Sequence, residues 1–130
     1  MLEFAIVLPL LVVVIFLLVN FGIVMNESEA ATQVASQAAR LAAVNSPMLG
    51  GGVGAFVHDQ AATKKLQTSN VSVCFPNGTA NVGDPVRVTV SVDAQVGAGR
   101  FIPAVTIPVK GSSTMRLEQV PTNFTSTGSC

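Results

Sequence analysis

The stretch that decides the fold is FAIVLPLLVVVIFLLVNFGIVM, residues 4–25, which holds no charged side chain. A helix needs about 20 mostly apolar residues to cross a bilayer, so this run is long enough. Its first polar residue is Asn20. We therefore predict one membrane-spanning helix at the amino-terminal end of the chain.

Of the three residues before this run only Glu3 is charged, and a basic residue first occurs at Arg40. An inserted helix normally keeps Lys or Arg on its cytoplasmic side, and a signal peptide begins with a basic region and has a shorter apolar core. The run is therefore unlike a signal peptide. Two explanations stay open: a basic leader was removed from in front of Met1, or Met1 is the initiator.

Glu3 stands at the start of the apolar run and is the only charged residue before Glu27. An acid in or near hydrocarbon costs on the order of a few kcal/mol, so such residues usually have a partner or a function. The nearest positive group is an α-amino group, either its own or that of a neighbouring copy. Glu3 either pairs with such an amine or stays hydrated at the headgroup level.

Two further residues of the run affect how helices pack. Pro9 removes a helix hydrogen bond and loosens the helix around Ala5, and neighbouring helices can satisfy the freed carbonyl. Gly22 lets another helix approach closely. Either residue is also compatible with an incidental role.

The helix is predicted to continue past the membrane through NESEAATQVASQAARLAAVN, residues 26–45, which contains neither Gly nor Pro. It should stop at Asn45-Ser46-Pro47, because Pro47 disfavours helical geometry at Ser46. Small side chains recur every four residues and allow close helix approach; they are Ala31, Ala35, Ala39 and Ala43. This face is covered either by helices of other copies or by the chain's own head.

The rest of the chain predicts a small β-rich head. Residues 47–69 form a hinge, with a loop over 48–54 and a short helix over 55–67. Residues 70–130 alternate apolar and polar side chains, most regularly at residues 86–93, and predict three or four antiparallel strands. Gly111-Ser112 is expected to be a turn between the last two strands, Pro103 and Pro108 suit an edge strand, and the tail 122–129 is expected to be loosely held. The fold class is α+β, with domains 1–46, 47–69 and 70–130.

Little in the sequence points to enzymatic chemistry. Cys74 and Cys130 form either a disulfide, as expected for an exported domain, or two free thiols in a reducing compartment. With the lone His58 they do not make a standard zinc site, and we predict no metal, cofactor or catalytic residue. Seven acids balance seven bases, which gives no indication of nucleic-acid binding. Asn70, Asn77 and Asn123 begin triplets that match the N-glycosylation pattern.

Two parts of the chain resemble a known family. The opening LEFAIVLPLL, the later NFG and AARLAA, and the carboxy-terminal GDPVRVTV and STMRLE are similar to TadE-like proteins of the tight-adherence branch of the type IV pilin superfamily. The resemblance implies a prepilin that a membrane peptidase cleaves and an inner-membrane machine extracts into a surface filament. In that family the early acid meets the terminal amine of another subunit, and Glu3 occupies the matching place.

The sequence therefore predicts a pilin subunit that waits in the inner membrane and polymerises with copies of itself into an extracellular pilus for adhesion or motility. Its assembly residues would be Glu3, Phe4, Pro9, Gly22, Ala31, Ala35, Ala39 and Ala43. The alternative is a bitopic envelope protein or minor pseudopilin that supports a partner without forming the shaft. A filamentous-phage coat protein fits less well, because the basic residues are scattered and would not face DNA.

Overall fold

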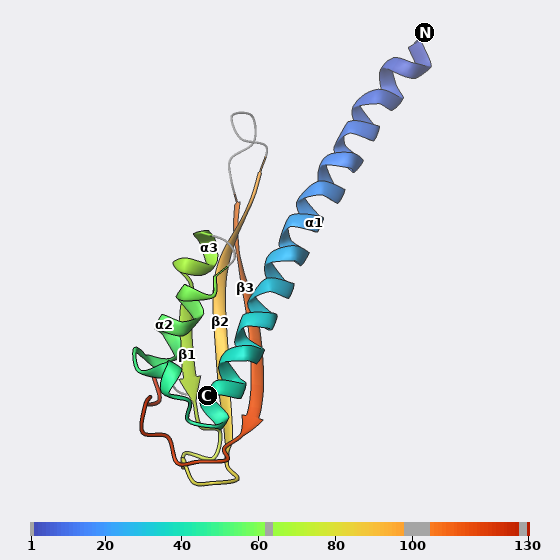
Figure 1. Cartoon of the computed structure of the whole chain (residues 1–130). Helices are drawn as coiled ribbons and strands as arrows, with labels where there is room; N and C mark the ends of the chain where they lie inside the picture. The colour runs from blue at the N-terminus through green and yellow to red at the C-terminus, as the bar shows by residue number, and fades with distance from the viewer. Residues whose placement is uncertain (1, 62–63, 98–104, 128–129) are drawn as a thin grey trace.

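The computed structural model describes residues 2–61, 64–97, 105–127 and 130. Along the chain it contains α1 (Leu2–Ala43), the 3-10 helix η1 (Pro47–Leu49), α2 (Gly52–Asp59), α3 (Lys64–Gln67), β1 (Asn70–Cys74), β2 (Pro85–Val96) and β3 (Val105–Arg116). Figure 1 shows the second half of α1 lying along the sheet, while its first half projects away from the head. The predicted α+β, pilin-like architecture is confirmed.

The helix α1 runs for 42 residues without interruption, and Pro9 lies inside it. At 1.5 Å per residue this length corresponds to about 63 Å, roughly twice the hydrocarbon thickness of a bilayer. One half of α1 can therefore cross a membrane while the other half belongs to the head.

The end of α1 is set by Asn45 and not by Pro47. Asn45 has a positive φ of 47°, and the amides of Asn45 and Ser46 donate to the carbonyls of Ala42 and Leu41. This pair of bonds is a Schellman motif, in which Asn takes the left-handed position more commonly held by Gly. Pro47 instead begins η1, with Ser46 as the N-cap in an extended conformation.

Asn45 also ties the helix end to the carboxy-terminal tail. Its carboxamide oxygen accepts from the amides of Thr122 and Asn123, and its nitrogen donates to the Thr122 hydroxyl at 2.8 Å. The side chain of Asn123 donates in return to the carbonyls of Asn45 and Ser46. The side chain of Asn45 therefore joins segments that are 77 residues apart in the sequence.

We expect Asn45→Gly to lower the free energy of unfolding by about 1–2 kcal/mol, because the three side-chain hydrogen bonds are lost while the left-handed backbone is kept. Asn45→Ala should cost about 1 kcal/mol more, since a Cβ is unfavourable in that conformation. Pulse proteolysis of the full chain in detergent at increasing urea measures both. An alanine variant as stable as the glycine variant would contradict this account of the helix end.

The segment between α1 and the sheet differs from its prediction. Residues 48–54 are not a loop throughout, because η1 includes Met48 and Leu49 and α2 already begins at Gly52. The predicted helix over 55–67 is divided into α2 and the four-residue α3. Apolar side chains on these short elements reach the core and hold the segment against the head; the buried ones are Leu49, Val53, Val57 and Leu66.

The sheet is antiparallel in the order β1-β2-β3. Its apolar face is built on alternate residues of β2, with Val88 opposite Val73 of β1 and Val92 opposite Val109 of β3. The valines of β2 that face α1 are almost completely buried; they are Val86, Val88, Val90 and Val92. Pro108 lies in β3, which is an edge strand as predicted, and Pro103 lies outside the described residues.

The predicted turn at Gly111-Ser112 is wrong, because β3 continues through both residues. Gly111 pairs with Val90 in the middle of the sheet. A Cβ at Gly111 would overlap the carbonyl carbon of Ala31 and the amide nitrogen of Thr32, and would lie 2.7 Å from the Ala31 carbonyl oxygen. Glycine is therefore needed here for close approach of β3 to α1.

Candidate functional site

The first part of α1 is an apolar helix with almost no cover. We call residues 2–19 the projecting segment; its described side chains are exposed, apart from the half-buried Phe16. Leu10, for example, is 68% exposed, Leu18 is 65% exposed and Ile6 is 71% exposed. Among the described helices, α1 is the one long and apolar enough to cross a membrane. Such a surface requires lipid or other protein around it.

The projecting segment ends where the head first reaches α1. The side chain of Asn20 is 6% exposed; its nitrogen donates to the Phe16 carbonyl at 2.7 Å, and its oxygen accepts from the Gly97 amide at 3.2 Å. Gly97 directly follows β2, so the β2–β3 hairpin reaches as far as Asn20 along the helix. The apolar residues 21–25 therefore lie beside the head, and the part of α1 free to enter hydrocarbon is shorter than the predicted 22-residue run.

Three of the predicted assembly residues at this end lie in the projecting segment, and Gly22 lies just beyond it. Glu3 is in the first turn of α1, and its side chain is outside the described ones. Phe4 is 69% exposed, and Pro9 is exposed. Gly22 is exposed as well, and a Cβ there would meet no atom within 4 Å, so its surface is open to a neighbouring helix.

The four alanines lie in a different environment. Ala31, Ala35 and Ala39 are completely buried, and Ala43 is 6% exposed. Ala31, Ala35 and Ala39 belong to the core formed by α1 and the sheet, so these small side chains let the chain's own head approach the helix. Of the two alternatives raised by the sequence, the structure has the head on this face. The outward side of the same stretch is polar and exposed; it carries Glu29, Gln33, Gln37 and Arg40.

Residues 1–40 match the family model described as TadE-like protein. The first 40 residues of the chain are therefore TadE-like. The match covers the projecting segment and most of the part of α1 that packs on the head, and so it contains Glu3, Phe4, Pro9 and Gly22. Comparisons with curated proteins and with solved structures gave no match. This match supports a pilin-like protein associated with the Tad pilus system, and α1 is long and apolar enough to anchor it in a membrane.

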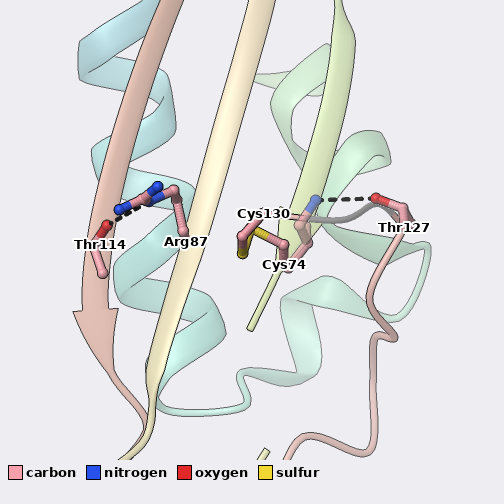
Figure 2. Close-up of a disulfide and its surroundings, with 6 residues drawn as sticks. Cys74, Arg87, Thr114, Thr127 and Cys130 are labelled. Atoms are coloured by element: carbon pink, nitrogen blue, oxygen red, sulfur yellow. Dashed lines mark hydrogen bonds between the residues drawn. A yellow bond between two sulfur atoms is a disulfide. The ribbon is translucent and has the colours of Figure 1, made fainter. Parts of the chain in front are cut away.

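The carboxy-terminal tail is bound to the head by a disulfide and by hydrogen bonds. Cys74, at the end of β1, forms a disulfide with Cys130, with their Cα atoms 5.5 Å apart. Figure 2 shows Thr127 beside this bond, where its hydroxyl accepts from the Val73 amide at 3.0 Å. The amide of Thr127 also donates to the Val73 carbonyl. The described part of the tail, predicted to be loosely held, is thus attached to β1.

Reduction of the disulfide should lower the free energy of unfolding by about 2–4 kcal/mol, because the disulfide closes a loop with a sequence separation of 56 residues. Pulse proteolysis of the full-length protein in detergent, with and without reductant, measures the difference. Thr127→Val is the matched control: it keeps the disulfide, removes one hydrogen bond and should cost about 1 kcal/mol. Equal stability of the oxidised and reduced protein would contradict a stabilising role for the bond.

The three candidate glycosylation residues differ in accessibility. Asn70 and Asn77 are exposed, at the start of β1 and in the turn that follows it. Asn123 is half-buried, and its side-chain nitrogen donates to two carbonyls at the end of α1. A sugar on that nitrogen would require these bonds to be given up, so Asn70 and Asn77 are the more accessible acceptors.

The carboxylate of Asp84 stabilises a turn in the head. In the turn before β2, the Thr79 hydroxyl donates to the Asp84 carboxylate at 2.6 Å and the Asn81 amide donates to it at 3.0 Å. These bonds hold the pKa of Asp84 below its usual value. The bonds therefore stabilise the turn at pH values above the usual pKa of an aspartate. This stabilisation is lost as the pH falls through the lowered pKa. Among the described residues, no three His, Cys, Asp or Glu side chains gather as metal ligands would.

Proposed function

We propose that this protein is a structural subunit that polymerises through α1 into an extracellular Tad-type pilus. The observation that carries the proposal is the projecting segment, an apolar helix of about five turns whose described side chains are exposed, apart from the half-buried Phe16. Lipid can cover it before assembly, and the same segments of neighbouring copies can cover it afterwards. A repeated contact that does not close on itself produces a helical filament.

Transfer of the projecting segment from lipid into a bundle of such segments changes its apolar environment little. The direction and register of assembly then depend on more specific contacts. We propose that Glu3 meets the terminal amine of a neighbouring copy, and that Phe4, Pro9 and Gly22 lie in the helix–helix contact. Because the head occupies the alanine face, neighbours would meet the outer half of α1 through its polar side, near Gln33 and Gln37.

The proposed partners follow from this route. The subunit would be cleaved by a prepilin peptidase at a leader in front of the mature end. The inner-membrane assembly machine would then extract it. The head would lie outside the cytoplasmic membrane, where a disulfide between Cys74 and Cys130 can form and persist. The role of the protein is structural and not enzymatic.

A second function shares the same geometry. A minor pseudopilin would keep α1 in the membrane, or enter the filament at a few positions, and would support assembly of another subunit. The alanine face favours this alternative in one respect: its side chains are already used within the chain, so a dense helix bundle would need other contacts outside the membrane.

Mechanical shearing of cells, followed by electron cryomicroscopy of the released filaments, separates the two functions. A shaft subunit should be released in quantity, and its α1 should trace through the filament core at every helical position. If the protein stays with the membrane after shearing, or occupies only isolated positions in the filament, the polymerising role is excluded and the minor one is supported.

A further inference from the structure

We propose that the end of the β2–β3 hairpin is a second membrane contact of this protein and docks into the headgroup region of the bilayer beside α1. We use the term hairpin end for residues 94–97 and 105–107. The inference rests on membrane anchoring by α1 and does not require polymerisation. It concerns the state before assembly, in which lipid surrounds the projecting segment.

The first observation is the height of the hairpin end along α1. The hydrogen bond from the Gly97 amide to the Asn20 side chain places the hairpin end beside Asn20. The projecting segment before Asn20 has 18 residues, 2–19, and spans about 27 Å. Because the hydrocarbon core is about 30 Å thick, Asn20 falls close to its outer boundary when α1 crosses the membrane. The hairpin end must then lie at the same boundary.

The second observation is the surface of the hairpin end. Val105 is 59% exposed and Ile107 is 40% exposed. They pair with Val96 and Ala94 and so lie on the sheet face that packs on α1. At about 3.3 Å per residue, Val96 and Val105 lie within about 5 Å of the level of Gly97, and Ile107 is about 10 Å further from the membrane centre than Gly97. Apolar faces at an interface sit about 5–10 Å into the boundary of headgroups and acyl chains.

The third observation is that the described residues of this surface carry no charge. In the described hairpin, residues 94–97 and 105–109 contain no ionisable side chain, and the nearest ones on the two strands are Asp93 and Lys110. On α1, the exposed Val19 and Ile23 flank Asn20, and the first acid after it is Glu27. The apolar surface of the hairpin end therefore continues the apolar surface of the projecting segment.

Lipid is the occupant that these observations favour. The surface adjoins the membrane-spanning helix at the height of the bilayer boundary, and it is present in a single chain. Figure 1 shows the hairpin directed along α1 toward the projecting segment, so that the head has a second element pointing toward the membrane. Contact at two places would fix the tilt of the head above the bilayer, which a single helix leaves free to vary.

The sequence contains no Trp and no Tyr, so one introduced Trp is an unambiguous fluorescent probe. The test uses full-length Val105→Trp in nanodiscs that hold one copy each, with lipids brominated either near the headgroup or near the end of the acyl chain. Val120→Trp is the matched control. Val120 is also a valine and is 55% exposed. It lies two residues after Glu118, whose amide donates to the Ala43 carbonyl. Ala43 is about 35 Å along α1 from Asn20.

We expect Val105→Trp to emit at shorter wavelength than Val120→Trp and to be quenched several-fold more strongly by the lipid brominated near the headgroup. Emission and quenching like those of the control would overturn the proposal. Emission at short wavelength without quenching by either lipid would also overturn it, because protein and not lipid would then cover the site. Ile107→Trp gives an independent reading if the first variant does not form its disulfide. Loss of filaments bears on polymerisation alone and leaves this measurement unchanged.

Discussion

Glu3→Ala is expected to leave the protein in the membrane but to abolish, or reduce by at least an order of magnitude, the filament material released by shearing. A carboxylate at this position has no basic partner in the first 39 residues of its own chain. In a helix bundle it would be buried, and an uncompensated buried charge costs about 3–5 kcal/mol. Pairing with the terminal amine of a neighbour removes this cost only in the correct register. Quantitative immunoblots of membrane and sheared fractions measure the effect.

Two further substitutions test whether the charge of Glu3 matters, as opposed to its side-chain volume or to the loss of any acid from α1. Glu3→Gln keeps the size and removes the charge, so it should assemble as poorly as the alanine variant if pairing with the amine is what matters. Glu29→Gln removes an exposed acid from the polar side of α1 and should have a much smaller effect. Normal piliation in Glu3→Gln would show that the carboxylate charge has no part in assembly.

Features that depend on local pattern were predictable from the sequence. The uncharged run at 4–25 identifies the helix, and the alternation at residues 86–93 identifies β2, because each periodicity follows directly from the geometry of its element. The TadE-like resemblance of the amino-terminal segment could also be recognised, because its acid and Leu-Pro pair lie within ten residues of the sequence.

Features that depend on contacts distant in sequence were not predictable in the same way. The sequence indicates a helix stop at Asn45, but it does not indicate that the Asn45 side chain bonds to a tail 77 residues away. Asn20 interrupts the apolar run in the sequence, but its partner Gly97 is also 77 residues away. Spacing alone could not decide which surface covers the alanine face, since a foreign helix and the chain's own sheet both favour small side chains there.

Gly111 shows how such a residue is misread. A glycine followed by serine between two apolar runs is typical of a turn, and that pattern led to the wrong division of β3. The signal that could have corrected it is the regular alternation on both sides of Gly111, which continues in phase through the glycine. An isolated Gly within a strand pattern indicates a bulge or a close backbone approach, and here the approach is to α1.

Gly111→Ala is expected to lower the free energy of unfolding of the head by about 3 kcal/mol or more. The added methyl group would overlap backbone atoms of Ala31 and Thr32, which cannot move away as a side chain can, and overpacking of this kind costs about 1–3 kcal/mol or more. Without that contact the substitution should stabilise by about 0.4–1 kcal/mol, since alanine restricts the unfolded chain. The predicted change in the free energy of unfolding is therefore opposite in sign to the change expected from the unfolded chain alone.

Gly54→Ala is the matched control, because it makes the same chemical change inside α2. There the new methyl group would meet the Val71 Cβ at 4.0 Å, an ordinary contact, and a helix gains about 0.5–1 kcal/mol when alanine replaces glycine. Pulse proteolysis of both full-length variants in detergent should move the urea midpoint in opposite directions. If Gly111→Ala is as stable as the unmodified protein, β3 does not approach α1 at Ala31, and the packing of the head on the alanine face must be different.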